Sequence, residues 1–193
     1  MLAAHVIFGA YGFWLPNDPR GSWSTFVGSW ELFRYGGSAT KTTAVQSLAH
    51  RKHDHGQRLA AKALLKRPAV KFTGHQAKAI GQGFQRYAAQ SELRTLACAI
   101  LPDHVHLVLA RHRHAPKQLA IQLKGAATRR LVEVGLHPFA TDNRPPPCFA
   151  RGEWTVYLDT VDDIHRAIKY VEDNPLKEGL PRQTWPFVMP LEE

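Results

Sequence analysis

The segment His104-Val105-His106 places two imidazoles in a short apolar run with the character of a β-strand. Side chains alternate along a strand, so the two histidines are predicted to point to one face and Val105 to the other. Imidazole is a common ligand for divalent transition metals, and two rings on a rigid strand could hold one ion. The chain has 11 histidines, so a chance pattern with purely structural hydrogen bonds is the alternative.

A second pair of chemically capable residues occurs near the end of the chain. Tyr170 and Asn174 are four residues apart in a stretch with helical periodicity and therefore share one helix face. The amide oxygen of Asn174 could complete a ligand set of two nitrogens and one oxygen, with positions left for water or a phosphate. In the alternative interpretation, Tyr170 packs at the rim of a sheet and Asn174 caps a helix that stops before Pro175.

Two longer segments containing these residues resemble a known family. The segment 101–108 (LPDHVHLV) is similar to the HUH signature of single-tyrosine transposases. The segment 168–180 (IKYVEDNPLKEGL) resembles the tyrosine-helix motif of their REP-associated branch. The motifs stand in the family's order, and the resemblance extends over about residues 93–185. Two motifs together are more specific than either one alone.

The resemblance implies a transposase-like enzyme that cuts single-stranded or hairpin DNA and transfers the strand. It implies that Tyr170 is the nucleophile of a 5′-phosphotyrosine intermediate, and that His104, His106 and Asn174 bind a divalent metal. The family implies Mg²⁺ or Mn²⁺, whereas imidazole ligands alone suit manganese or zinc. A tight zinc site would ordinarily need a third His or Cys, and none stands in register in the sequence.

The sequence is also compatible with two other functions. A catalytically silent DNA-binding or regulatory protein of the same fold would retain the basic surface, although it would have no need of a tyrosine one turn from a metal ligand. A metallophosphoesterase that activates water would need the two histidines and no tyrosine, and Tyr157 is a further candidate nucleophile. A covalent adduct between protein and DNA would distinguish these possibilities.

The elements that must position these residues follow from hydrophobic periodicity. A strand is predicted at 3–13, and Pro, Asn and Asp at 15–19 end it. The further elements are strands at 93–101, 104–110 and 153–158, and helices at 75–92, 117–135 and 162–173, the last stopped by Asn174-Pro175. A poorly periodic insertion occupies about residues 16–70 and contains a helix near 58–66. Without the insertion, the order predicts a single α+β domain over 1–193, with a ferredoxin-like split βαβ antiparallel sheet backed by helices.

The charge excess points to a polyanionic partner. The 193 residues include 25 Lys and Arg against 16 Asp and Glu, a net charge of +9, which favours salt-sensitive binding to nucleic acid. Five basic residues could contact phosphates, although exposed basic residues are often only solvated: Lys124, Arg129, Arg130, Arg111 and Arg113. Aromatic residues that bracket the insertion could stack on unpaired bases, but a small satellite core is the favoured interpretation for Trp14, Trp23, Phe26 and Trp30.

The remaining composition favours a cytoplasmic protein. Cys98 and Cys148 lie far apart and form no CxxC pattern, which fits a reducing compartment. The first residues lack the basic region of an export signal, and no apolar run is long enough to span a membrane. The sequence leaves open whether the protein acts as a monomer or a homodimer.

Overall fold

A computed structural model describes residues 1–22, 24–42, 51–139 and 145–191. The chain divides into two compact units, one comprising Met1–Ala10 with Lys71–Glu193 and the other comprising Tyr11–Val70. The insertion expected at about residues 16–70 falls within the second unit. No helix in the described residues is long and apolar enough to cross a bilayer.

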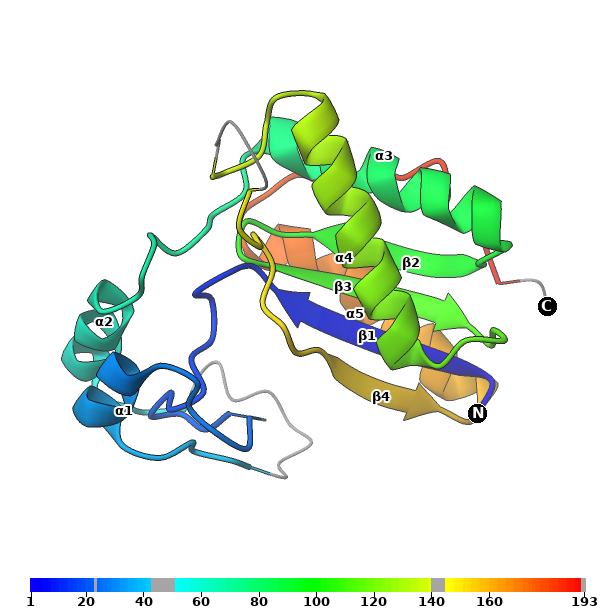
Figure 1. Cartoon of the computed structure of the whole chain (residues 1–193). Helices are drawn as coiled ribbons and strands as arrows, with labels where there is room; N and C mark the ends of the chain where they lie inside the picture. Colours follow the sequence, from blue (N-terminus) through cyan, green and yellow to red (C-terminus); the bar gives the residue numbers. More distant parts are fainter. Residues whose placement is uncertain (23, 43–50, 140–144, 192–193) are drawn as a thin grey trace. The chain divides into compact units, whose positions relative to one another are not determined.

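The larger unit is built on a four-stranded antiparallel sheet with the order β2-β3-β1-β4 (Figure 1). Its strands are β1 (Ala3–Gly9), β2 (Thr95–Ile100), β3 (His104–Ala110) and β4 (Trp154–Leu158). Its helices are α3 (Gly74–Ser91), α4 (Pro116–Glu133) and α5 (Val161–Lys177). The order β1-α3-β2-β3-α4-β4 confirms the predicted ferredoxin-like α+β fold, and β3 has the predicted bounds.

The two faces of the sheet are covered by different helices. Helices α3 and α4 lie on one face and α5 lies on the other (Figure 1). Strand alternation explains this division, because Phe8 packs against Phe84 of α3 on the first face. On the second face, Ala99 and Val108 belong to a core cluster with Val171 of α5. Residues that alternate with Phe8 along β1 therefore lie on the face that α5 covers.

Two predicted boundaries in the larger unit were wrong. The first strand ends at Gly9 instead of continuing to residue 13, because the chain leaves the sheet there and enters the second unit. Helix α5 continues through Asn174-Pro175 to Lys177 and has Glu178 as its C-cap. Pro175 has no backbone N–H to donate to the carbonyl of Val171, but the buried side of α5 continues through Asn174 and Pro175, so packing offsets that loss. Gly179, with φ of 70°, then ends the helix in a left-handed conformation.

The Tyr11–Val70 unit contains two short helices, α1 (Trp30–Gly36) and α2 (His55–Ala63). The sequence did not predict α1. The predicted helix at 58–66 begins earlier because Asp54 accepts a hydrogen bond from the backbone N–H of Gln57 and caps the helix at that point. The small apolar centre of this unit consists of Leu15, Leu32 and Ala61, with Val27 and Leu65 packed against them.

Close approach of α3 and α4 depends on Gly83. A Cβ atom at this position would lie 2.7 Å from the carbonyl oxygen of Ala126 and 2.8 Å from the Cα of Ala127. We expect Gly83→Ala to lower the free energy of unfolding by about 1–2 kcal/mol, because separating the helices costs more than the gain in helix propensity. Urea unfolding measures this change.

The matched control for that substitution is Gly125→Ala on α4. A Cβ atom at Gly125 would meet only the end of the Arg129 side chain, at 3.4 Å. Since alanine stabilises a helix interior by about 1 kcal/mol relative to glycine, this variant should be more stable than the wild type. Equal effects of the two substitutions would contradict the importance of backbone contact at Gly83.

Candidate active site on the α5 face of the sheet

Strand β3 places His104 and His106 on the face that α5 covers. Their ring centroids are 4.8 Å apart, with the rings at 72° to one another. His106 is 3% exposed, whereas His104 is half-buried. The expected shared face is therefore present, but His106 lies much deeper than a ligand in an open pocket would.

The Nδ1 atom of each ring is held by a different partner. Asp103 Oδ1 lies 2.7 Å from His104 Nδ1, and His5 Nε2 lies 3.0 Å from His106 Nδ1. A carboxylate can only accept, so Nδ1 of His104 is the donor, and in the tautomer with a single ring proton the lone pair is on Nε2. Partners of this kind commonly fix the tautomer and orientation of metal-binding histidines.

His5 is a site residue that the sequence reasoning missed. It projects from β1 onto the same sheet face, and its ring stacks on that of His106 with centroids 5.2 Å apart. In the β1–β3 register, His106 stands opposite Ile7, so His5 is its diagonal neighbour. In the sequence, His5 is recognisable as a polar residue in the middle of an apolar strand. Its partner cannot be identified from the sequence, because it depends on the register between β1 and β3.

Burial keeps the central imidazoles neutral. It lowers the pKa of His5 from 6.5 to about 4. The pKa of His106 is well below 6.5, first because of burial and further because of the nearby charges of His104, His5 and Lys177. A neutral imidazole retains the lone pair that a metal or a hydrogen-bond donor requires.

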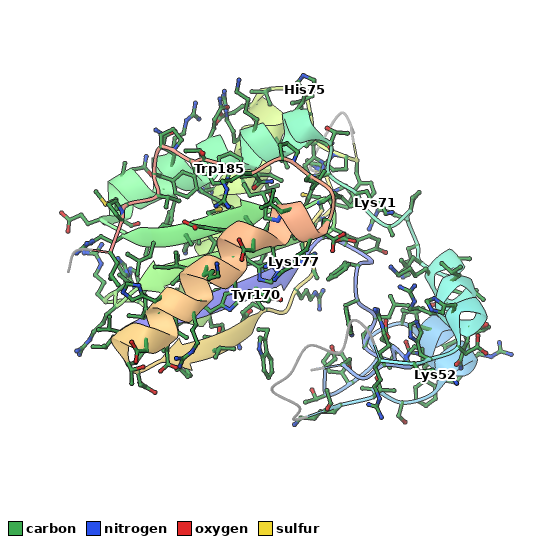
Figure 2. The ribbon with its side chains drawn as sticks, turned by 180° about the vertical axis from the view of Figure 1, so that it is seen from behind. Lys52, Lys71, His75, Tyr170, Lys177 and Trp185 are labelled. Carbon is green, nitrogen blue, oxygen red and sulfur yellow. The ribbon has the colours of Figure 1, made fainter. Side chains whose placement is uncertain are left out.

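Tyr170 lies over this pair of histidines from α5. Its ring centroid is 5.7 Å from that of His106 and 5.8 Å from that of His5, and the residue is 40% exposed. Lys177 Nζ lies 4.6 Å from the centroid of the tyrosine ring. Figure 2, which views the α5 side, shows Tyr170 and Lys177 next to one another along the helix. Lys177 is the second residue that sequence reasoning missed, although its seven-residue spacing from Tyr170 places both on one helix face.

Asn174 lies one turn after Tyr170 within the uninterrupted helix. Its Nδ2 donates to the backbone carbonyl of Tyr170 over 3.0 Å, and the residue is 8% exposed. The alternative interpretation of Asn174 as the C-cap is wrong, because Glu178 caps the helix. With Nδ2 bonded to the helix, the side-chain orientation of Asn174 is fixed and Oδ1 is the atom that could ligate a metal.

A set of three metal ligands at this site requires an amide oxygen in addition to the two imidazoles. Among the described residues, no group of three or more His, Cys, Asp and Glu side chains is arranged to hold a metal. His104 and His106 have imidazoles with engaged Nδ1 atoms, and the amide oxygen of Asn174 is the atom that could join them as a ligand. Such a set leaves coordination positions for water and phosphate.

The basic residues predicted to contact DNA are distributed differently. The prediction for Lys124 needs correction, because this side chain is 8% exposed and its ammonium donates to the backbone carbonyls of Ala150, Arg151 and Gly152. Lys124 also lies near Phe8, on the sheet face opposite α5. Its role is to satisfy loop carbonyls.

The four arginines remain candidates to different degrees. Arg130 is engaged with Gln82 and Glu133 on the surface that α3 and α4 form. Arg129 is exposed on α4, which lies across the sheet from Tyr170. Arg111 and Arg113 are exposed directly after β3. The structure therefore does not bring Arg129 or Arg130 together with the tyrosine and histidines.

The similarities to known proteins are similarities of fold. Neither a protein-family model nor a curated protein matches this sequence. One similar solved structure is a REP-associated tyrosine transposase bound to a REP hairpin, with 12% identity, a TM-score of 0.48, and coverage of 96% of this chain and 74% of the other. Another is a candidate transposase from Deinococcus radiodurans R1, with 15% identity, a TM-score of 0.42, and coverage of 89% of both chains. Neither likeness assigns chemistry to this chain.

Proposed function

We propose that this protein is a metal-dependent endonuclease and strand transferase for single-stranded or hairpin DNA, with Tyr170 as its nucleophile. The observation that carries the proposal is the packing of Tyr170 against His106, with ring centroids 5.7 Å apart. A potential nucleophile and a potential metal ligand thus meet from two different elements. The net charge of +9 favours a polyanionic substrate.

The proposed reaction exchanges one phosphate ester for another. The Tyr170 oxygen attacks the phosphorus and forms a 5′-phosphotyrosine bond, while the bond to the 3′ oxygen breaks. The 3′ oxygen leaves with the bonding electron pair and takes up a proton, and the phenol loses one. Because a phenolate leaves more easily than an alkoxide, a 3′-hydroxyl of another strand can reverse the step and complete a transfer.

The surrounding residues have distinct roles in this proposal. His104, His106 and Asn174 would hold Mg²⁺ or Mn²⁺, which when bound would draw charge from the scissile phosphate and favour the phenolate. His5 would accept a hydrogen bond from His106 Nδ1, so that Nε2 of His106 carries the lone pair. Lys177, with its ammonium 4.6 Å from the tyrosine ring centroid, would stabilise negative charge on the phenolate and phosphate.

The decisive experiment is to trap the covalent intermediate. We expect the wild-type protein, incubated with Mn²⁺ or Mg²⁺ and a labelled single-stranded DNA, to form an adduct that survives denaturing electrophoresis. EDTA should prevent its formation. Proteolysis and mass spectrometry should locate the nucleotide on the peptide containing Tyr170.

Other outcomes would select the other functions. Cleavage without an adduct would indicate water as the nucleophile and a metallophosphoesterase. Binding without cleavage, in the presence of either metal and of several single-stranded and hairpin substrates, would indicate a catalytically silent DNA-binding protein. An adduct located on Tyr157 would retain the reaction class but overturn the proposed site.

A further inference from the structure

The aromatic residues of the Tyr11–Val70 unit divide into an internal and an exposed group. Trp14 belongs to the internal group: it is half-buried, its Nε1 donates to the backbone carbonyl of Gly21 over 2.7 Å, and the Arg20 guanidinium lies 3.8 Å from the centroid of its ring. Phe26 and Trp30 are 68% and 67% exposed. The satellite-core interpretation is therefore wrong for these two residues, and Trp23 lies outside the described residues.

Trp30 and Phe33 form a stacked pair on the surface of α1, which we call the α1 aromatic pair. Their ring centroids are 5.8 Å apart and the ring planes differ by 13°. Phe33 is 43% exposed, while Leu32, between them in sequence, is the residue that α1 buries. The core of this unit therefore does not require either ring, and a flat aromatic surface remains in contact with solvent.

The same unit carries most of the positive charge of the protein. Between Tyr11 and Val70 there are 9 Lys and Arg and 3 Asp and Glu, a net charge of +6 (9 minus 3) within a chain of net charge +9. One pair cancels internally, because buried Arg20 binds both carboxylate oxygens of Asp18 at 2.8 Å. The exposed basic residues are Arg34, Lys41, Arg51, Lys52, Lys66 and Arg67.

A basic residue also lies close to the start of α1. The pKa of Glu31 is lowered, first by the Ser29 hydroxyl and also by the charge of Lys66. The only acidic side chain on α1 therefore has a cation nearby. Lys66 is thus a cation near the start of α1 that can attract a phosphate, in agreement with the charge excess of the unit.

We propose that the α1 aromatic pair is a base-stacking site for single-stranded DNA, with the basic residues of the unit binding the phosphates. Every unpaired base has a π face that can stack on Trp or Phe, whereas bases in a duplex are already stacked on one another. The +6 charge favours a polyanion over an ordinary apolar protein partner. This inference rests on the proposed function, from which it takes the substrate class, and it assigns a binding role to the insertion.

The test measures affinity without allowing cleavage. The full chain in EDTA is titrated into a fluorescent oligothymidylate and, separately, into an abasic strand of the same length. Trp30→Ala should weaken binding to oligothymidylate about tenfold or more, because it removes one stacked base contact. Trp30→Phe should retain much of the affinity. The abasic strand should bind the wild type and Trp30→Ala equally.

The matched control is Leu59→Ala on α2. Leu59 is 61% exposed in the same unit but has no π face, so its removal should leave the affinity for oligothymidylate unchanged. Unchanged affinity of Trp30→Ala would overturn the stacking site. An equal loss for the abasic strand would do the same, and so would a wild-type dimer that Trp30→Ala converts to a monomer, because the pair would then be a contact between copies.

The outcome is independent of the test for the proposed function. EDTA prevents cleavage in every binding measurement. If no covalent adduct forms but Trp30→Ala loses base-dependent affinity, the stacking site stands and the nuclease proposal fails. If the adduct forms and affinity does not depend on Trp30, the nuclease proposal stands and the stacking site fails.

Discussion

Tyr170→Phe should form no covalent adduct with single-stranded DNA, and its cleavage rate should fall by at least roughly 10³-fold. The substitution removes one hydroxyl and keeps the ring that packs against His5 and His106. Packing and DNA affinity should therefore change little, so the loss can be assigned to the missing nucleophile. Gel-based adduct formation and cleavage rates, measured with Mn²⁺, check this result.

Three further variants make the assignment specific. Tyr157→Phe should form the adduct normally, because Tyr157 lies on β4 and is 60% exposed. His106→Ala should abolish the adduct together with Mn²⁺ binding. Asn174→Ala should retain part of the activity if water replaces the amide oxygen. Cleavage by Tyr170→Phe at the wild-type rate would rule out the proposed nucleophile even if the other variants behave as expected.

Acid should destabilise the metal-free protein well before its carboxylates are protonated. His5 has a pKa of about 4 in the folded protein and 6.5 as its ordinary value. Between these values the unfolded chain binds more protons, so the free energy of unfolding decreases as the pH falls from about 6.5 to about 4. The shift corresponds to about 3 kcal/mol for His5 alone, and His106 adds to the loss in the same direction. Urea unfolding in EDTA between pH 7 and pH 5 should show roughly 2 kcal/mol of this His5 contribution, because that range covers only part of the shift.

The control for this pH dependence is His5→Gln, which cannot titrate but still offers an amide oxygen to His106. Its free energy of unfolding should depend less on pH over the same range, by the share that His5 contributes, because His106 still titrates in the variant. The lowered pKa values of Glu31, Glu133 and Asp163 affect stability only below their ordinary values of 4.5, 4.5 and 3.8, so they do not interfere above pH 5. His137 also has a lowered pKa, but it contributes equally to both proteins. Identical slopes for wild type and variant would contradict a neutral, buried His5.

The sequence was informative wherever a local period determined the structure. Period-two alternation was sufficient to predict β3 and the common face of His104 and His106. Helical spacing placed Tyr170 and Asn174 on one face, although Pro175 suggested too early an end for α5. Proline often marks a helix end because it removes one backbone hydrogen bond and crowds the preceding turn, but here the buried side of α5 includes Pro175 and the helix runs two residues past it.

Features that depend on tertiary contacts could not be read from local patterns. The pairing of His5 with His106 requires the β1–β3 register, which joins segments about one hundred residues apart in sequence. Lys124 looked like a basic surface residue, but its exposure is decided by the loop that packs over α4 and accepts its hydrogen bonds. The exposure of Trp30 similarly depends on the orientation of the short helix α1, which buries Leu32.

The segment after α5 determines which edge of the sheet can accept another strand. The Gln183 side chain bonds both the backbone N–H and the carbonyl of Ile100, at 2.8 Å each. Farther along, Val188 forms a bridge with Thr95, and Met189 N–H donates to the Thr95 carbonyl. These contacts occupy β2, so an incoming strand would have to displace the segment. β4 is the other edge in the strand order. If two copies associate by extending the sheet, they should therefore do so through β4, antiparallel and about a twofold axis.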